Sequence, residues 1–201
     1  FFERYRVLFP NDASAIVVGE GKDYLLDTRL MPVCRRNQLE SLDALASALS
    51  EGSNKELAQQ VIEAMTTNET SFFRHRGTLD AIGKSLVEST QPGQPLRIWS
   101  AASSTGQEPY SVAILMAELG LTARCKVSIV ATDIDRVVLA RARDAIYTDH
   151  ELERGIDQAT RARYFVPEDG GWKVKDDLRR LIRFEQLDIT RGLPPIAGNQ
   201  F

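Results

Sequence analysis

The fold of this chain is decided by the stretch Ile98-Trp-Ser-Ala-Ala-Ser-Ser-Thr-Gly-Gln-Glu-Pro-Tyr-Ser111. A short strand is predicted over Leu96 to Ser100 and a helix over Gln107 to Leu119, so a bend of small residues joins the two. In open α/β sheets, ligands bind at such turns, outside the carboxyl ends of the strands. The bend lacks the glycine fingerprint of dinucleotide sites, which makes a pyrophosphate ligand less favoured.

The residues that follow repeat the same strand-then-helix pattern. A second strand is predicted over Lys126 to Thr132, a helix over Asp135 to Ala145, and a third strand over Leu181 to Leu187. Strands that alternate with helices of this length predict a parallel sheet with right-handed crossovers. Between the second and third strands we expect a helix near residues 157–164, then a hairpin that turns at Asp169-Gly170-Gly171.

Acidic residues stand near the carboxyl ends of the first two predicted strands, where each can either bind a ligand or cap the helix that follows. Asp133 follows the second strand and can accept hydrogen bonds from both hydroxyls of a ribose, whereas Asp135 is placed to cap the next helix. Thr105 and Glu108 have the spacing of a capping box, although a capped helix can still border a pocket. Two acids without a phosphate cradle suit a cationic sulfonium ligand better than an anionic one.

The region before residue 88 is predicted to be helical. Helices are expected around residues 24–31, from Ser41, over residues 54–65 and over residues 78–87, with Pro32 kinking or ending the first of them. A polar linker, residues 88–95, separates this region from the first strand. The segment Met65-Thr-Thr-Asn-Glu-Thr-Ser-Phe-Phe-Arg74 interrupts the helices with residues that favour caps and turns.

Composition narrows the classes of function. The chain has 201 residues and a formal charge of −3, which gives no general attraction to nucleic acid. Its two cysteines, Cys34 and Cys125, are expected to be buried free thiols rather than a disulfide or a metal site, so we expect no metal ion. No apolar run is long enough to span a membrane and no signal peptide is recognisable, which favours a cytoplasmic protein. Both ends have the pattern of a cut, and we expect a fragment of a longer protein.

Three motifs together resemble the CheR family of chemotaxis receptor methyltransferases. They are residues 66–74, residues 98–111 and Ala131-Thr-Asp-Ile-Asp135, in the same order and spacing. The resemblance implies a Rossmann-like α/β core that binds S-adenosylmethionine (SAM), incomplete here, over residues 89–201. It also implies an all-helical N-terminal domain over residues 1–88 and a small β-hairpin subdomain at about residues 163–178.

The resemblance also implies a set of site residues. By position, Asn68, Thr70 and Arg74 contact the cofactor from the helical side, with Arg74 also the candidate catalytic residue. Glu108 and Asp133 contact it from the sheet side. Asp188 and Ile189 stand where the family has an Asn-Leu pair near the adenine, and the aspartate keeps an acceptor but loses the amide donor.

The implied activity is transfer of a methyl group from SAM to glutamate side chains of the cytoplasmic domain of bacterial chemoreceptors, which leaves S-adenosylhomocysteine. The chain stops before a further family signature, so the fragment itself is expected to be inactive. Its hairpin connection is shorter than in members that bind a receptor pentapeptide, so no such tethering is expected. Two alternatives stay open: a non-catalytic SAM-binding sensor or interaction module, and a methyltransferase acting on nucleic acid or a small molecule.

Basic residues on the first predicted helix suggest how a receptor docks. Arg29, Arg35 and Arg36 lie on or just beyond this helix and are complementary in charge to an acidic methylation region. A solvated basic face that binds nothing is an equally good interpretation.

Overall fold

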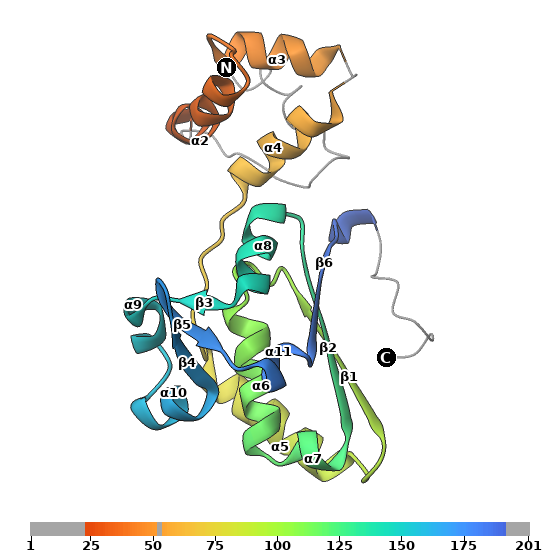
Figure 1. The fold of residues 1–201 in the computed structure, drawn as a ribbon. Coiled ribbons are helices and arrows are strands. Elements are labelled where there is room, and N and C mark those ends of the chain that lie inside the picture. The colour runs from red at the N-terminus through yellow and green to blue at the C-terminus, as the bar shows by residue number, and fades with distance from the viewer. Residues whose placement is uncertain (1–22, 52–53, 192–201) are drawn as a thin grey trace. The chain divides into compact units, whose positions relative to one another are not determined.

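The computed structural model describes residues 23–51 and 54–191 (Figure 1). Their contacts divide them into two compact units, one of residues up to Thr67 and one from Asn68 to Ile189. The helix α5 (Arg76–Ser89) packs against α6 (Gln107–Glu118) and so belongs to the second unit. This division by contacts falls between Thr67 and Asn68, and the domain boundary expected at residue 88 stays a prediction.

The first unit is a group of helices with a shared apolar core. It contains α2 (Asp23–Arg36), α3 (Leu42–Ser50) and α4 (Lys55–Met65). The Ser41 side chain accepts a hydrogen bond from the Ala44 amide, which confirms the predicted cap, and Asn54 caps α4 in the same way through the Leu57 amide. The buried face is made of residues at helical spacing, Leu26, Leu30, Val33, Leu45, Leu57 and Val61.

Of the two outcomes expected at Pro32, a kink or an end of the helix, the end is wrong, because α2 continues to Arg36. Proline removes the hydrogen bond to the carbonyl four residues earlier, which belongs to Thr28. Both Pro32 and Thr28 are exposed, so water can replace the missing donor. The proline is therefore tolerated on the outer face of the helix.

The second unit is built on a parallel sheet, as predicted. Its strands β1 (Pro95–Ala101), β2 (Lys126–Asp133) and β6 (Ile182–Gln186) lie in the order β1-β2-β6. In the register, Ala101 pairs with Thr132, and Asp133 pairs with Gln186. All three strands therefore end at one edge of the sheet, where the turns that follow them lie close together.

Helices cover this sheet and connect its strands. The central one, α6, contacts β2 and β6 on one side and α5 on the other. The short α7 (Leu121–Arg124) leads into β2, and α8 (Arg136–Asp144) follows it. The core is formed mainly by α6 and the sheet, with Tyr110, Ile114, Met116, Ile129 and Leu121 among its most buried side chains.

A small antiparallel sheet is inserted between α8 and β6 (Figure 1). The predicted hairpin is present as β4 (Phe165–Glu168) and β5 (Gly171–Val174), and β3 (Ile146–Tyr147) pairs with the other side of β5. The helices α9 (Asp149–Glu153) and α10 (Gln158–Tyr164) connect β3 to β4, and α11 (Asp176–Arg179) follows β5. The sequence pattern missed β3 because two residues give no periodicity.

Two further observations concern the described part of the chain. Cys34 and Cys125 are both buried and free, as predicted, and burial raises the pKa of the Cys34 thiol above its usual value. Within residues 23–51 and 54–191, no helix combines the length and apolar character that crossing a bilayer requires.

Candidate functional site

The bend between β1 and α6 has an unusual backbone. The φ angles of Ala102, Ser104 and Gly106 are 54°, 48° and 94°, so every second residue lies in the left-handed region. For a residue with a side chain, this conformation costs about 1–2 kcal/mol. Backbone strain of this kind persists only where the surroundings hold it, and it is concentrated at functional sites.

Hydrogen bonds from neighbouring segments hold this bend. The Ser103 amide donates to the Thr132 carbonyl at 2.9 Å, and the Gly106 amide donates to the Ser103 carbonyl at 3.0 Å. Ser104 contributes twice, because its amide donates to Asp133 Oδ2 at 2.8 Å and its hydroxyl donates to the Asn68 carbonyl at 2.9 Å. The bend is thereby joined to the end of β2 and to the segment before α5.

Asp133 lies directly beside the bend, as its predicted role requires. Its side chain is 6% exposed, and its Oδ1 accepts a hydrogen bond of 3.0 Å from the Asp135 amide. A carboxylate offers about four acceptor positions, so the two backbone amides leave capacity for a ligand hydroxyl. Asp135 caps α8 as predicted, because it accepts from the amides of Val137 and Val138.

The capping box expected at the start of α6 is absent, and that interpretation was wrong. Gly106 occupies the N-cap position without a side-chain hydrogen bond. The Thr105 hydroxyl donates to Gln107 Oε1 at 2.7 Å, whereas Glu108 Oε1 accepts a 2.7 Å hydrogen bond from the Ser100 hydroxyl. Because Gly106 rather than Thr105 occupies the N-cap, Thr105 lies outside the helix and the third helical residue is Pro109, which has no N–H to cap, while Glu108 bonds to Ser100 at the end of β1.

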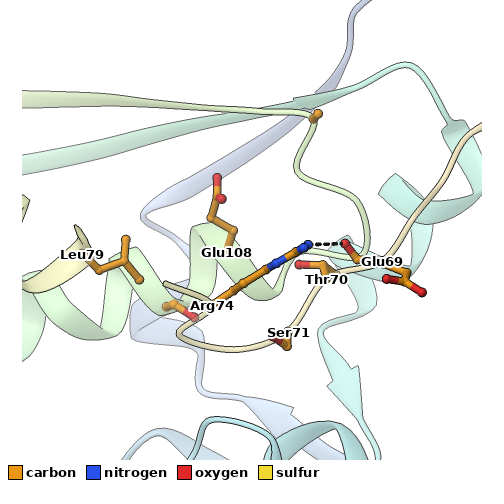
Figure 2. A pocket seen from close by; sticks show the side chains of 8 residues that line it. Glu69, Thr70, Ser71, Arg74, Leu79 and Glu108 are labelled. Carbon is orange, nitrogen blue, oxygen red and sulfur yellow. Dashed lines mark hydrogen bonds between the residues drawn. The ribbon is translucent and has the colours of Figure 1, made fainter. Parts of the chain in front are cut away.

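A pocket opens between the bend, the start of α6 and the segment that precedes α5 (Figure 2). Its empty volume is about 420 Å³, including its mouth. Three of the predicted site residues line it together with five others: Thr70, Arg74 and Glu108, with Glu69, Ser71, Leu79, Ala102 and Ser111. A carboxylate from α6 and a guanidinium from the preceding segment therefore share one pocket.

Arg74 reaches this pocket from an irregular stretch of backbone. Its neighbours Phe73 and His75 have φ angles of 49° and 57°, and His75 occupies the N-cap position of α5. The Arg74 Nη1 atom donates to the Glu69 carbonyl at 3.1 Å, as the dashed line in Figure 2 shows. This single hydrogen bond uses one of five guanidinium N–H groups, which leaves donors for an anionic group.

The remaining predicted residues lie around the bend rather than along the pocket. Asn68 Nδ2 donates to Asp135 Oδ2 at 2.9 Å, so its side chain ties the segment before α5 to the β2–α8 turn. Asp188 and Ile189 follow β6, and the Leu187 amide donates to the Asp133 carbonyl at 2.9 Å. These residues therefore lie at the edge of the sheet that carries Asp133.

Sequence reasoning overlooked Ser111, which positions the pocket wall. Its hydroxyl donates to the Gln107 carbonyl at 2.6 Å and accepts from the Phe73 amide at 2.9 Å. A signal was present in the sequence, because residues three apart share a helix face and Ser111 lies three after Glu108. Phe72 and Phe73, in the same segment as Arg74, lie in the core and are 1% and 7% exposed.

These features define a class of protein. A parallel α/β sheet with a small-residue bend after its first strand and a buried acid at the end of its second is typical of Rossmann-like proteins that bind an adenosine-type ligand. Residues 68–199 match the family model of the CheR methyltransferase, SAM binding domain. The chain belongs to this family of SAM-dependent methyltransferases, with SAM as the methyl donor.

Curated relatives agree with this assignment. The chain is 39% identical over 188 residues to a chemotaxis protein methyltransferase of Vibrio parahaemolyticus, covering 90% of this chain and 68% of the relative. It is 34% identical over 196 residues to the chemotaxis protein methyltransferase Cher2 of Pseudomonas putida, covering 94% of this chain and 71% of the relative. A chemotaxis protein methyltransferase of Salmonella typhimurium is 32% identical over 189 residues.

Proposed function

We propose that this protein transfers a methyl group from SAM to glutamate side chains of a chemoreceptor cytoplasmic domain, as part of chemotaxis. The observation that carries the proposal is the contact between the Ser104 amide and Asp133 Oδ2, because it brings the bend and the strand-end acid to one site. The assignment to the CheR methyltransferase family supports the activity.

The chemistry of the pocket fits a SAM molecule. Its lining offers the Glu108 carboxylate and the Arg74 guanidinium, which suit the cationic and the carboxylate groups of SAM. We assign Asp133 to the ribose, and Glu108 to the cationic sulfonium and amine side of the ligand. We place Asn68 and Thr70 along the ligand from the segment before α5, and Asp188 and Ile189 near the adenine.

The proposed reaction is an in-line displacement. SAM supplies a methyl carbon bonded to a positively charged sulfur. A glutamate carboxylate oxygen forms the new O–CH₃ bond, the S–CH₃ bond breaks, and its electron pair stays on the sulfur, giving a methyl ester and S-adenosylhomocysteine. A glutamate has an ordinary pKa of about 4.3, so the nucleophile is already ionised and this chain needs no general base.

The residues of the chain therefore act by holding and orienting the reactants. Arg74 is the proposed catalytic residue, because its guanidinium in the pocket can bind a carboxylate with two parallel hydrogen bonds. That carboxylate is either the incoming glutamate or the carboxylate of SAM itself. Holding nucleophile, methyl and sulfur in line supplies rate through orientation.

The docking hypothesis is retained for two of the three arginines. We leave Arg29 out of this proposal, because its Nη1 atom donates to the carbonyls of Met65 and Thr66 at 2.8 and 2.9 Å, where it holds the end of α4. Arg35 and Arg36 lie in the last turn of α2 and are exposed. We propose that these two face the acidic methylation region of a receptor.

The decisive experiment combines binding with methyl transfer. Calorimetric titration of the full-length protein with SAM and S-adenosylhomocysteine should show binding of both. A tritiated-methyl assay on receptor-containing membranes should then label receptor glutamates with an ester that alkali removes. Binding without transfer would support a sensor module, and transfer to nucleic acid or a small molecule instead of receptor would overturn the proposed substrate.

A further inference from the structure

Tyr147 is a buried residue of the small sheet that extends to the SAM pocket. Its main chain is fixed, because β3 pairs with β5 at Trp172 and a side chain at Gly171 would overlap the Tyr147 carbonyl. Its ring meets Phe72 edge-on, with centroids 4.9 Å apart, and Tyr110 at 6.2 Å. The ring therefore contacts two separate parts of the unit, the segment before α5 and the helix α6.

The hydroxyl of Tyr147 contacts the strained bend. It donates to the Thr105 carbonyl at 2.7 Å, and a Cβ at Gly106 would lie 2.9 Å from the Tyr147 hydroxyl oxygen. The Tyr147 hydroxyl therefore has room only because position 106, the last left-handed position of the bend, is a glycine. Burial raises the Tyr147 pKa well above its usual value, which keeps the hydroxyl a donor at neutral pH.

The ring of Tyr147 also supports the opposite wall of the pocket. Phe72, which it contacts edge-on, lies between Thr70 and Arg74, two residues that line the pocket. The Phe72 carbonyl in turn packs so closely on Gly155, two residues after α9, that a side chain there would overlap it. The small sheet and its helices therefore contact both the bend and the Arg74 segment.

We propose that Tyr147 is a positioning residue for SAM: its hydroxyl fixes the bend through the Thr105 carbonyl, and its ring fixes the Arg74 segment through Phe72. The inference rests on the proposed SAM site and makes the small sheet part of the cofactor-binding machinery. Without the hydroxyl, the bend can relax out of its left-handed conformation, and binding must then restore it. Affinity for the cofactor falls as a result.

Tyr110 provides a matched control. It belongs to the same buried cluster, and its hydroxyl donates to a backbone carbonyl at 3.0 Å, but that carbonyl belongs to Ala142 of α8. Tyr147→Phe and Tyr110→Phe therefore each remove one buried hydroxyl and leave one carbonyl without its donor, and Tyr110→Phe also removes the contact of its hydroxyl with Arg179. Of the two, only Tyr147→Phe removes a hydrogen bond made directly to the bend.

The test uses both variants in the full-length protein. Both should fold and lose a similar amount of thermal stability. Tyr147→Phe should raise the Kd for S-adenosylhomocysteine about tenfold, raise the KM for SAM by a similar factor, and leave kcat and the KM for receptor within about twofold. In the ligand-free protein, amide hydrogen exchange over residues 102–107 should be faster in Tyr147→Phe and unchanged in Tyr110→Phe.

The outcomes separate this inference from the proposed function. Equal S-adenosylhomocysteine affinities for the two variants, or unchanged exchange in the bend of Tyr147→Phe, would overturn the role of Tyr147 while leaving the methyltransferase proposal intact. Failure of the unsubstituted protein to bind S-adenosylhomocysteine would overturn the proposed site, and the inference with it. A fall in kcat without a change in Kd would also contradict a positioning role in cofactor binding.

Discussion

The backbone amide of Ser104 donates a 2.8 Å hydrogen bond to Oδ2 of Asp133, a residue 29 positions later in the chain. The second carboxylate oxygen accepts from the Asp135 amide. One buried side chain thus joins the β1–α6 bend to the β2–α8 turn. Any ligand that uses Asp133 therefore binds a surface whose backbone is already organised.

Substitution of Asp133 should damage both stability and binding. Asp133→Asn replaces one acceptor by an NH₂ group that must face a backbone amide, so we expect the free energy of unfolding to fall by about 1.5–3 kcal/mol. The Kd for S-adenosylhomocysteine should rise at least about tenfold. Denaturant unfolding and calorimetry measure the two effects, with the exposed Asp144→Asn as the charge-matched control. Unchanged affinity would remove Asp133 from the site.

Glu108→Gln tests the charge near the sulfonium. The amide keeps an oxygen for the Ser100 hydroxyl, and Glu108 does not cap α6, whose N-cap is Gly106, so stability should change by less than about 0.5 kcal/mol. Affinity for cationic SAM should fall more than affinity for S-adenosylhomocysteine, whose sulfur is neutral. Glu118→Gln, at the other end of α6, serves as the control. Equal losses for the two ligands would argue that Glu108 does not face the sulfur.

Arg74 variants should separate the two carboxylates that it can bind. If Arg74→Ala raises the Kd for S-adenosylhomocysteine about tenfold, the residue binds the cofactor; if it raises only the receptor KM, it binds the incoming glutamate. Arg74→Lys should recover little, because an ammonium cannot form the bidentate pair. The control is Arg76→Ala, which removes an exposed ion pair with Asp80. Normal affinity together with normal turnover would exclude Arg74 from both roles.

Charge reversal on α2 tests receptor docking. In the double variant Arg35→Glu/Arg36→Glu, receptor kcat/KM should fall about tenfold at low salt, and the loss should shrink as salt screens the charges. Calorimetry should find SAM affinity unchanged. Lys55→Glu, at the start of α4, is the control within the same unit. Methylation that stays normal at low salt would show that these arginines are only solvated.

Alkaline pH should destabilise the second unit. Burial raises the pKa values of Tyr110, Tyr147 and Tyr164 above the usual value. The unfolded chain loses these protons near pH 10 while the folded state keeps them, so the free energy of unfolding should decrease as the pH rises above about 10. The ultraviolet absorbance of tyrosinate should therefore increase together with the loss of native circular dichroism. Ionisation of all three in a protein that stays folded would contradict the burial argument.

Local sequence pattern predicted much of this protein. The alternation of strands and helices after residue 95 predicted the parallel sheet, and the cap residues Ser41 and Asp135 were identified because a side chain bonding to its own helix start is a short-range event. The capping box at Thr105 failed because spacing alone cannot reveal that Gly106 adopts a left-handed conformation. The strand β3 was missed because two residues give no periodicity and their pairing partners in β5 lie 25 or more residues later in the chain.

The sequence by itself determined the α/β class, through the local spacing of its strands and helices, and its three motifs determined the family, whose resemblance implied the candidate pocket residues Thr70, Arg74 and Glu108. Only the tertiary structure decided that Arg29 supports α4 and that Tyr147 supports the bend. Both roles depend on hydrogen bonds between segments 36 and 42 residues apart. Such bonds exist only after the core has packed, and no local pattern in the chain encodes them.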